Sequence, residues 1–127
     1  GGKIYFDPNL HVTYRPRSTV KALAKQYFEY GRWRRVVSRR HKGTINYRYL
    51  APPVALLGFL ASLCVGALLH PIFFAPAAIY LLFVLGASIS IASSFTQYIY
   101  LLVVIPTMHF AWGAGFITSP ASLVPAD

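Results

Sequence analysis

Few residues of this 127-residue chain could do chemistry, and most of those that could are cations. The three carboxylates are Asp7, Glu29 and Asp127, and no two of them fall on one predicted element, so no acid–base pair is indicated. The sequence has no Cys/His spacing typical of a metal site, no glycine-rich phosphate loop and no Ser/His/Asp arrangement. It therefore predicts no catalytic residue and no metal ligand within this segment.

Anion binding is the chemistry that the residue types favour, and it falls in the basic, aromatic-rich stretch 17–41. All twelve Lys and Arg lie at or before Arg48, and no charged side chain occurs from Tyr49 to Ala126. Arginines interleaved with aromatic residues can bind nucleic acid, but the long uncharged run beside them indicates a membrane, so no nucleic-acid partner is expected. Lipid phosphates or a diphosphate leaving group are the expected anions. A solvated, positively charged flank with no further role is the other interpretation.

Two histidines are the residues of the uncharged run that can gain charge near neutral pH. Proton and ion pumps usually carry acidic or basic groups inside the bilayer, so a transporter is not indicated. His70 stands at a predicted span end and is expected at the membrane interface. His109 shares a helix face with Trp112 and Gly113 in the sequence HFAWGAGF. Two interpretations stay open for it, namely helix packing or a position near a lipid headgroup.

The transmembrane region, residues 49–127, is predicted to contain three spanning helices, because about 20 apolar residues of helix cross a bilayer. They cover about residues 52–70, 73–92 and 98–117. Residues 93–97 form a polar break before the third span, and Pro106 is expected to kink that span. Small residues at four-residue spacing favour close helix packing; they are Gly58, Ser62, Gly66, Gly86 and Ser90. Cys64 has no partner in the chain and is expected to be a buried, unreactive thiol.

Residues 17–48 are predicted to form amphipathic helices that lie in the membrane interface. Their apolar face begins with Val20, Leu23, Ala24 and Tyr27 at helical spacing. Helices of this kind place aromatic rings at headgroup depth and cations toward phosphates.

The start and end of this segment follow from local signals. Ser18 is the expected N-cap, and Glu29 is expected to be neutralised by Lys25 and Arg32. The apolar pattern loses phase at Gly31, so a bend there and a second short helix to about residue 40 are expected. The positive-inside rule places this segment in the cytoplasm, so three spans would put the last residues of the chain on the opposite side.

Residues 1–16 are predicted to be the end of a soluble β domain. Two short runs rich in aromatic and branched residues, 4–6 and 10–14, flank the turn signal Asp7-Pro8-Asn9. Such a hairpin is too small to have a core of its own. The chain begins Gly-Gly with no signal peptide, so we expect Gly1 to be internal to a longer polypeptide.

The order of these motifs resembles membrane-anchored family 2 glycosyltransferases, particularly bacterial ones with a C-terminal membrane region. In that family an inverting GT-A domain ends in a strand of the form V-x-Y-x-P-R, and a segment of the form Q-x-x-x-Y-G-x-W-R precedes the spans. Here the strand is residues 12–17. The second motif is carried by Gln26, Tyr30, Gly31, Trp33 and Arg34. The sequence HFAWGAGF is similar to the closing membrane motif of the group, whereas Glu29 stands where many relatives have Arg.

The resemblance implies a membrane α-helical fold with a short β-hairpin remnant of the GT-A domain. It also implies transfer of a sugar from a nucleotide-diphosphate donor to a lipid-linked or polysaccharide acceptor, at the cytoplasmic face of the inner (plasma) membrane. The catalytic Asp residues and a divalent cation, Mg²⁺ or Mn²⁺, would lie upstream of this segment, where the cation would offset the charge of the leaving diphosphate.

Roles for individual residues are carried over from the same resemblance. The five residues of the Q-x-x-x-Y-G-x-W-R motif would roof the donor or acceptor site. Arg17 and Arg35 would bind phosphate or lipid headgroups, and His109 and Trp112 would lie on the membrane side. The alternative is a non-catalytic membrane anchor or subunit whose basic helices dock a partner or anionic lipid.

Overall fold

The computed structural model describes residue 2 and residues 18–124, and this part of the chain is mainly helical, without a strand. Its α-helices are α1 (Val20–Arg40), α2 (Ala51–Leu68), α3 (Ala75–Ile91) and α4 (Phe95–Thr118). Its short 3-10 helices are η1 (Tyr47–Tyr49), η2 (Pro71–Phe74) and η3 (Ala121–Leu123). The predicted hairpin and Arg17 lie outside the described residues.

Three helices of the described part are long and apolar enough to cross a membrane, as the sequence predicts. They are Ala51–Leu68, Pro71–Ile91 and Phe95–Thr118. The third begins earlier than expected, because Ser94 caps it by accepting a hydrogen bond from the Gln97 N–H at 3.3 Å. Gln97, assigned to the polar break, therefore belongs to the first turn of α4. The helix also continues through Pro106, so the proline does not end it.

The basic segment is one continuous helix, α1, and the predicted bend at Gly31 is wrong. The N-cap is Thr19 in place of Ser18, and its Oγ1 accepts a hydrogen bond from the Ala22 N–H at 3.2 Å. The expected neutralisation of Glu29 is confirmed for Arg32, whose Nη1 lies 2.8 Å from the carboxylate.

The apolar pattern loses phase at Gly31 because arginines cover the packed face of α1 beyond that residue. Gly31 and Val36 are buried, and Arg35 and Arg39 are partly buried. Arginine stems can cover apolar surface while their guanidinium groups find polar or aromatic partners. Because arginines form this part of the packed face, it does not show an apolar periodicity in the sequence. The pattern therefore predicted a bend at Gly31, where the helix continues.

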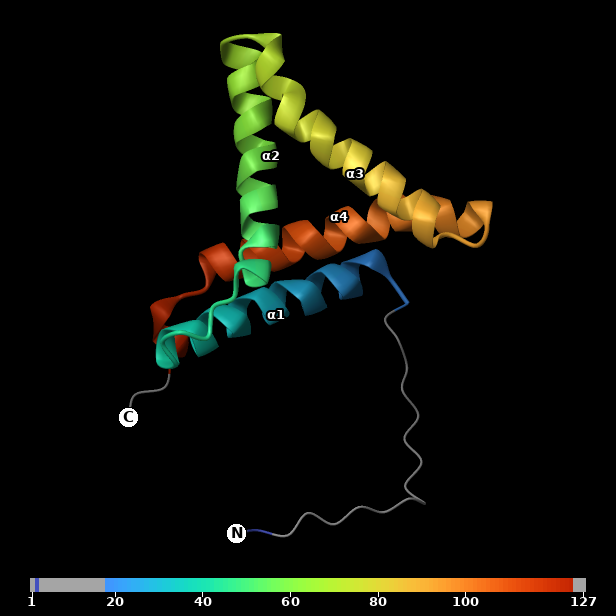
Figure 1. Ribbon diagram of the computed structural model, residues 1–127. Helices are drawn as coiled ribbons and strands as arrows, with labels where there is room; N and C mark the ends of the chain where they lie inside the picture. Colours follow the sequence, from blue (N-terminus) through green and yellow to red (C-terminus); the bar gives the residue numbers. More distant parts are fainter. Residues whose placement is uncertain (1, 3–17, 125–127) are drawn as a thin grey trace, which may run out of the picture.

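α1 and α4 lie side by side and run parallel (Figure 1). Gly31 packs on the backbone of Trp112, where a Cβ on the glycine would overlap the carbonyl oxygen. Four residues further along each helix, the Arg35 guanidinium lies 5.0 Å from the centroid of the Phe116 ring. This row of contacts advances in the same direction on both helices.

A second row of contacts gives the same direction. The backbone of Phe28 packs on Gly115, where a Cβ would lie 2.8 Å from the Phe28 carbonyl carbon. Four residues on, Ser119 Oγ donates a hydrogen bond to the Arg32 carbonyl oxygen at 3.1 Å. The glycines on each helix therefore allow a close backbone-to-backbone approach.

Ser62 joins α2 to the start of α3. Its Oγ donates to the Phe73 carbonyl oxygen at 2.6 Å and accepts from the Ala77 N–H at 3.1 Å. The amide of Ala77 lies in the first turn of α3, where helix N–H groups have no partner within the helix. A side chain on one membrane helix thus caps the next.

The predicted contacts through small residues form at the turn between α2 and α3 but not elsewhere. The ring of Phe74 lies against Gly66, where a Cβ would come within 2.7 Å of it. No described residue comes within 4 Å of a Cβ position at Gly58 or Gly86. Cys64, expected to be buried, is exposed, because α2 contacts its neighbours along one narrow stripe.

α2, α3 and α4 form the sides of a triangle, and α1 lies along α4 on the side away from the α2–α3 hairpin (Figure 1). The triangle closes where Gly113 of α4 packs on the backbone of Pro52 at the start of α2. Its interior holds an aromatic cluster of Phe59, Tyr80 and Phe110, one from each helix, with ring centroids 5.2 to 5.6 Å apart. Aromatic pairs at this separation stabilise a packed core.

Candidate functional site

A groove between α1, η1, the start of α2 and α4 brings together four of the predicted site residues. We call it the tryptophan groove; it is lined by Tyr30, Trp33, Arg34, Val37, Arg48, Tyr49, Pro52 and Trp112. Its volume is about 470 Å³. Trp33 is 52% exposed and Tyr30 is 51% exposed, so both rings remain available to a ligand. The two predicted motifs, far apart in the sequence, therefore meet at one site.

Four residues of the tryptophan groove were not predicted from the sequence. Arg48 and Tyr49 stand where the charged part of the chain gives way to the uncharged run, and this junction was the signal that could have identified them. Pro52 follows directly in the first turn of α2. Val37 lies one turn after Trp33 on α1.

Arg34 is fixed in the groove by the loop between α1 and η1. Its guanidinium lies 3.7 Å from the centroid of the Tyr49 ring, which is a cation–π contact. Its Nη2 donates a hydrogen bond to the carbonyl oxygen of Thr44. Gly43, with φ of 84°, makes the preceding turn in a conformation that favours glycine. Nε of Arg34 is buried and has no hydrogen-bond partner among the described residues, so an acceptor that reached it would be favoured.

Gln26 lies beside the tryptophan groove and does not line it. Its Nε2 donates a hydrogen bond to the Tyr30 hydroxyl at 2.5 Å. A neighbouring hollow of about 430 Å³ is lined by Ala22, Lys25, Gln26, Glu29 and Tyr30. Gln26 therefore orients Tyr30, which is shared by the hollow and the groove.

Gly31 and Arg35, two further predicted site residues, face α4. Gly31 lets the backbone of Trp112 approach α1, and Arg35 lies over the ring of Phe116. The Phe116 ring in turn stacks on Trp112 at 5.3 Å. Both residues thus set the position of Trp112 and take no part in lining the groove.

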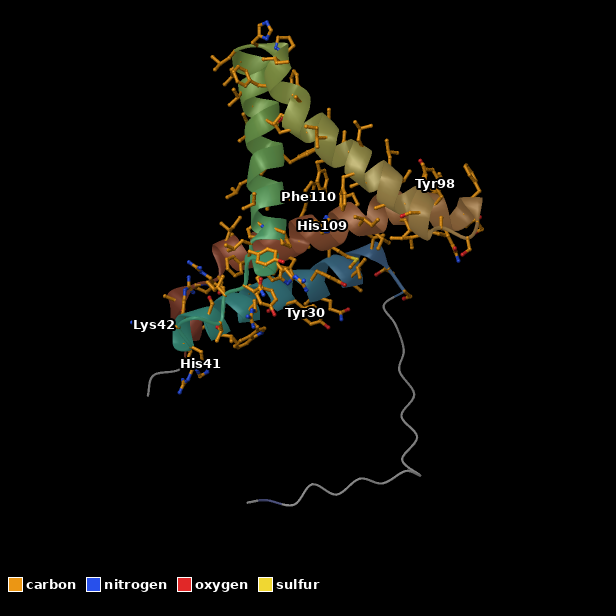
Figure 2. The ribbon with its side chains drawn as sticks, viewed as in Figure 1. Tyr30, His41, Lys42, Tyr98, His109 and Phe110 are labelled. Atoms are coloured by element: carbon orange, nitrogen blue, oxygen red, sulfur yellow. The ribbon has the colours of Figure 1, made fainter. Side chains whose placement is uncertain are left out.

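His109 and Trp112 point into different spaces, although they are only three residues apart. Trp112 lines the tryptophan groove, while His109 lines a pocket of about 270 Å³ inside the triangle. The Tyr80 hydroxyl and His109 Nδ1 are 3.2 Å apart, at hydrogen-bonding distance. Figure 2 shows His109 and Phe110 on the side of α4 that faces α2 and α3. Of the two interpretations left open for His109, these contacts favour helix packing.

The described residues include no group of three or more His, Cys, Asp or Glu side chains that could hold a metal ion. No family model, curated protein or solved structure matches the chain. The geometry of the tryptophan groove is therefore the basis for a functional assignment.

Proposed function

We propose that this chain is the membrane portion of an inverting glycosyltransferase. The full protein would move a sugar from a nucleotide-diphosphate donor to a lipid-linked or polysaccharide acceptor at the cytoplasmic face of the membrane. One observation carries the proposal: Trp33 and Arg34 of the interface motif and Trp112 of the closing motif line one groove. The family resemblance rests on these same two stretches of sequence.

The composition of the tryptophan groove suits the phosphate-bearing end of a lipid-linked acceptor. Arg34 and Arg48 supply guanidinium groups, which match phosphate oxygens through paired hydrogen bonds. Trp33 and Trp112 supply flat apolar rings of the kind that line small-molecule sites. The groove also lies where the charged segment meets the apolar helices, as an amphiphile with a polar head and a hydrocarbon tail requires.

The divalent cation that the resemblance implies has no ligand set among the described residues. The resemblance implies that cation binding and the chemical step belong to an upstream GT-A domain. The role proposed for the described residues is to hold and orient the acceptor at the membrane surface.

Intrinsic fluorescence can test acceptor binding, because Trp33 and Trp112 are the two tryptophans of the sequence and both line the groove. The chain would be titrated in detergent with a prenyl phosphate and, separately, with the matching neutral prenol. We expect a saturable change with the phosphate and an affinity at least tenfold weaker for the alcohol. Equal responses to the two lipids would oppose the proposal. Arg34→Gln should weaken phosphate binding, and Lys42→Gln, in the exposed turn after α1, is the matched control for loss of charge.

Sugar transfer itself requires the native polypeptide. We expect it to release a nucleoside diphosphate from at least one nucleotide-sugar donor when acceptor is present, and we expect Trp33→Ala to lower transfer and acceptor affinity. Normal transfer and normal affinity in the variant would refute the role given to Trp33.

A non-catalytic anchor or subunit is the second candidate. It is favoured by the exposed cations Lys21, Lys25 and Lys42, which can meet an anionic lipid surface or an acidic partner. The two candidates differ in one readout: an anchor would release no nucleotide from any donor.

A further inference from the structure

The end of α4 lies against the basic helix α1. Ser119, the residue after α4, accepts a hydrogen bond at its carbonyl oxygen from Arg39 Nη2 at 2.9 Å. Its hydroxyl donates to the Arg32 carbonyl oxygen at 3.1 Å, and the residue is 4% exposed. These direct bonds place the end of α4 and α1 on the same side of the membrane.

α1 cannot itself cross the bilayer. Its cationic side chains are Lys21, Lys25, Arg32, Arg34, Arg35, Arg39 and Arg40. Each cation at the centre of a membrane helix costs about 2.5–3.5 kcal/mol on insertion scales. α1 therefore stays at the surface, and it fixes the basic side of the membrane.

The start of α2 lies on this basic side too. Pro52 packs on Gly113 near the end of α4, and both Pro52 and Trp33 line the tryptophan groove. The chain thus enters α2 from the basic side and is back on that side at Ser119. A path that begins and ends on one side of a membrane crosses it an even number of times. Three crossings, as predicted from apolar length alone, do not satisfy these contacts.

We propose that the chain crosses the membrane twice, through α2 and through η2 with α3, and that α4 lies along the membrane surface beneath α1. Two observations single out α4. It runs parallel to α1 and in contact with it, so it shares the orientation of a helix that cannot cross (Figure 1). The middle of α4 is also partly covered by its neighbours: between Leu101 and Ala114 every residue except Val103 is half-buried or buried, whereas most of the first turns, residues 95–100, are exposed.

The other two apolar helices have the surface expected of membrane spans. Large apolar side chains are exposed on both, for example Val54 at 65% in α2, and Ile79 at 66% and Leu82 at 65% in α3. Such surfaces are stable in hydrocarbon and costly in water. The layers from the basic side inward are then α1, α4 and the inserted α2–α3 hairpin, with its turn at His70 on the far side.

Single-cysteine labelling tests this arrangement in the whole chain. In a Cys64→Ser background, one cysteine is introduced at an exposed site by Lys42→Cys, Leu69→Cys or Ser122→Cys. A membrane-impermeant maleimide is applied to right-side-out and to inverted vesicles, and full labelling in detergent establishes that each thiol is reactive. Ala121→Cys, also at an exposed site, provides a second reporter for the end of α4.

We expect Ser122→Cys and Ala121→Cys to be labelled from the same side as Lys42→Cys, and Leu69→Cys from the opposite side. Labelling of the two reporters after α4 from the side opposite to Lys42→Cys would require an odd number of crossings and overturn the proposal. Labelling of Leu69→Cys from the side of Lys42→Cys would also overturn it, because the hairpin would then not cross.

Discussion

Gly31 in α1 packs directly on the backbone carbonyl of Trp112 in α4. A Cβ on Gly31 would overlap the carbonyl oxygen and lie 2.8 Å from the Phe116 backbone nitrogen. Backbone atoms fill this space, so they cannot move aside as a flexible side chain would. The contact holds two parallel helices together, so that Trp112 of α4 and Trp33 of α1 both line the tryptophan groove.

Gly31→Ala should therefore separate α1 from α4 and lower stability. Overpacking of a close contact typically costs about 1–3 kcal/mol, while Gly→Ala at an open helix position gains about 0.5–1 kcal/mol. Gly58→Ala is the matched control, since no described residue lies within 4 Å of its Cβ position. Thermal unfolding in detergent, followed by circular dichroism, should show a lower midpoint for Gly31→Ala alone. Equal midpoints for the two variants would mean that the contact does not form.

Ser62→Ala should destabilise the hairpin of α2 and α3. The substitution removes the partner of the Ala77 N–H and of the Phe73 carbonyl, and a buried polar group left without a partner costs about 1–3 kcal/mol. Ser90→Ala provides the control, because its hydroxyl is exposed and donates to the Ala87 carbonyl of its own helix. Hydrogen exchange at the Ala77 amide should accelerate in Ser62→Ala and stay unchanged in Ser90→Ala. Unchanged exchange in both variants would exclude the inter-helix cap.

The three apolar helices could be predicted from the sequence because their signal is local. A run without charges and of sufficient length needs no knowledge of its neighbours, and Ala51–Leu68, Pro71–Ile91 and Phe95–Thr118 follow from it. Whether each helix crosses the bilayer is not local information. The topology proposed above rests on contacts such as the hydrogen bond between Arg39 and Ser119, which joins parts of the chain 80 residues apart.

The candidate site was predictable only in part, for the same reason. Trp33 and Arg34 were identified from their motif, but Arg48 and Tyr49 come from a loop whose path depends on Gly43 and a 3-10 turn. The bend wrongly predicted at Gly31 arose because the α1–α4 contact uses glycines and arginine stems. Neither contributes to an apolar periodicity.

Arg39→Met should loosen the segment after α4. The methionine keeps an apolar stem but cannot donate to the Ser119 carbonyl, and a hydrogen bond from a charged group contributes about 1.5–3 kcal/mol. Chymotrypsin cleavage after Leu123 should therefore accelerate about tenfold or more, in line with the lower end of that range. Lys42→Met removes a charge from the exposed turn and should leave the cleavage rate unchanged. Equal acceleration in the two variants would show that net charge, and not this bond, protects the segment.

Arg34→Lys should weaken phosphate binding in the tryptophan groove even though the charge is retained. Lysine cannot present a planar guanidinium to the Tyr49 ring at 3.7 Å, nor two parallel donors to a phosphate. Loss of one of the two hydrogen bonds to the charged phosphate costs about 1.5–3 kcal/mol, which corresponds to an affinity for prenyl phosphate about tenfold weaker or more. Lys42→Arg is the reciprocal control and should leave affinity unchanged. If Arg34→Lys bound as tightly as the unaltered chain, charge alone would account for binding, and the fixed position of Arg34 over Tyr49 would have no part in recognition.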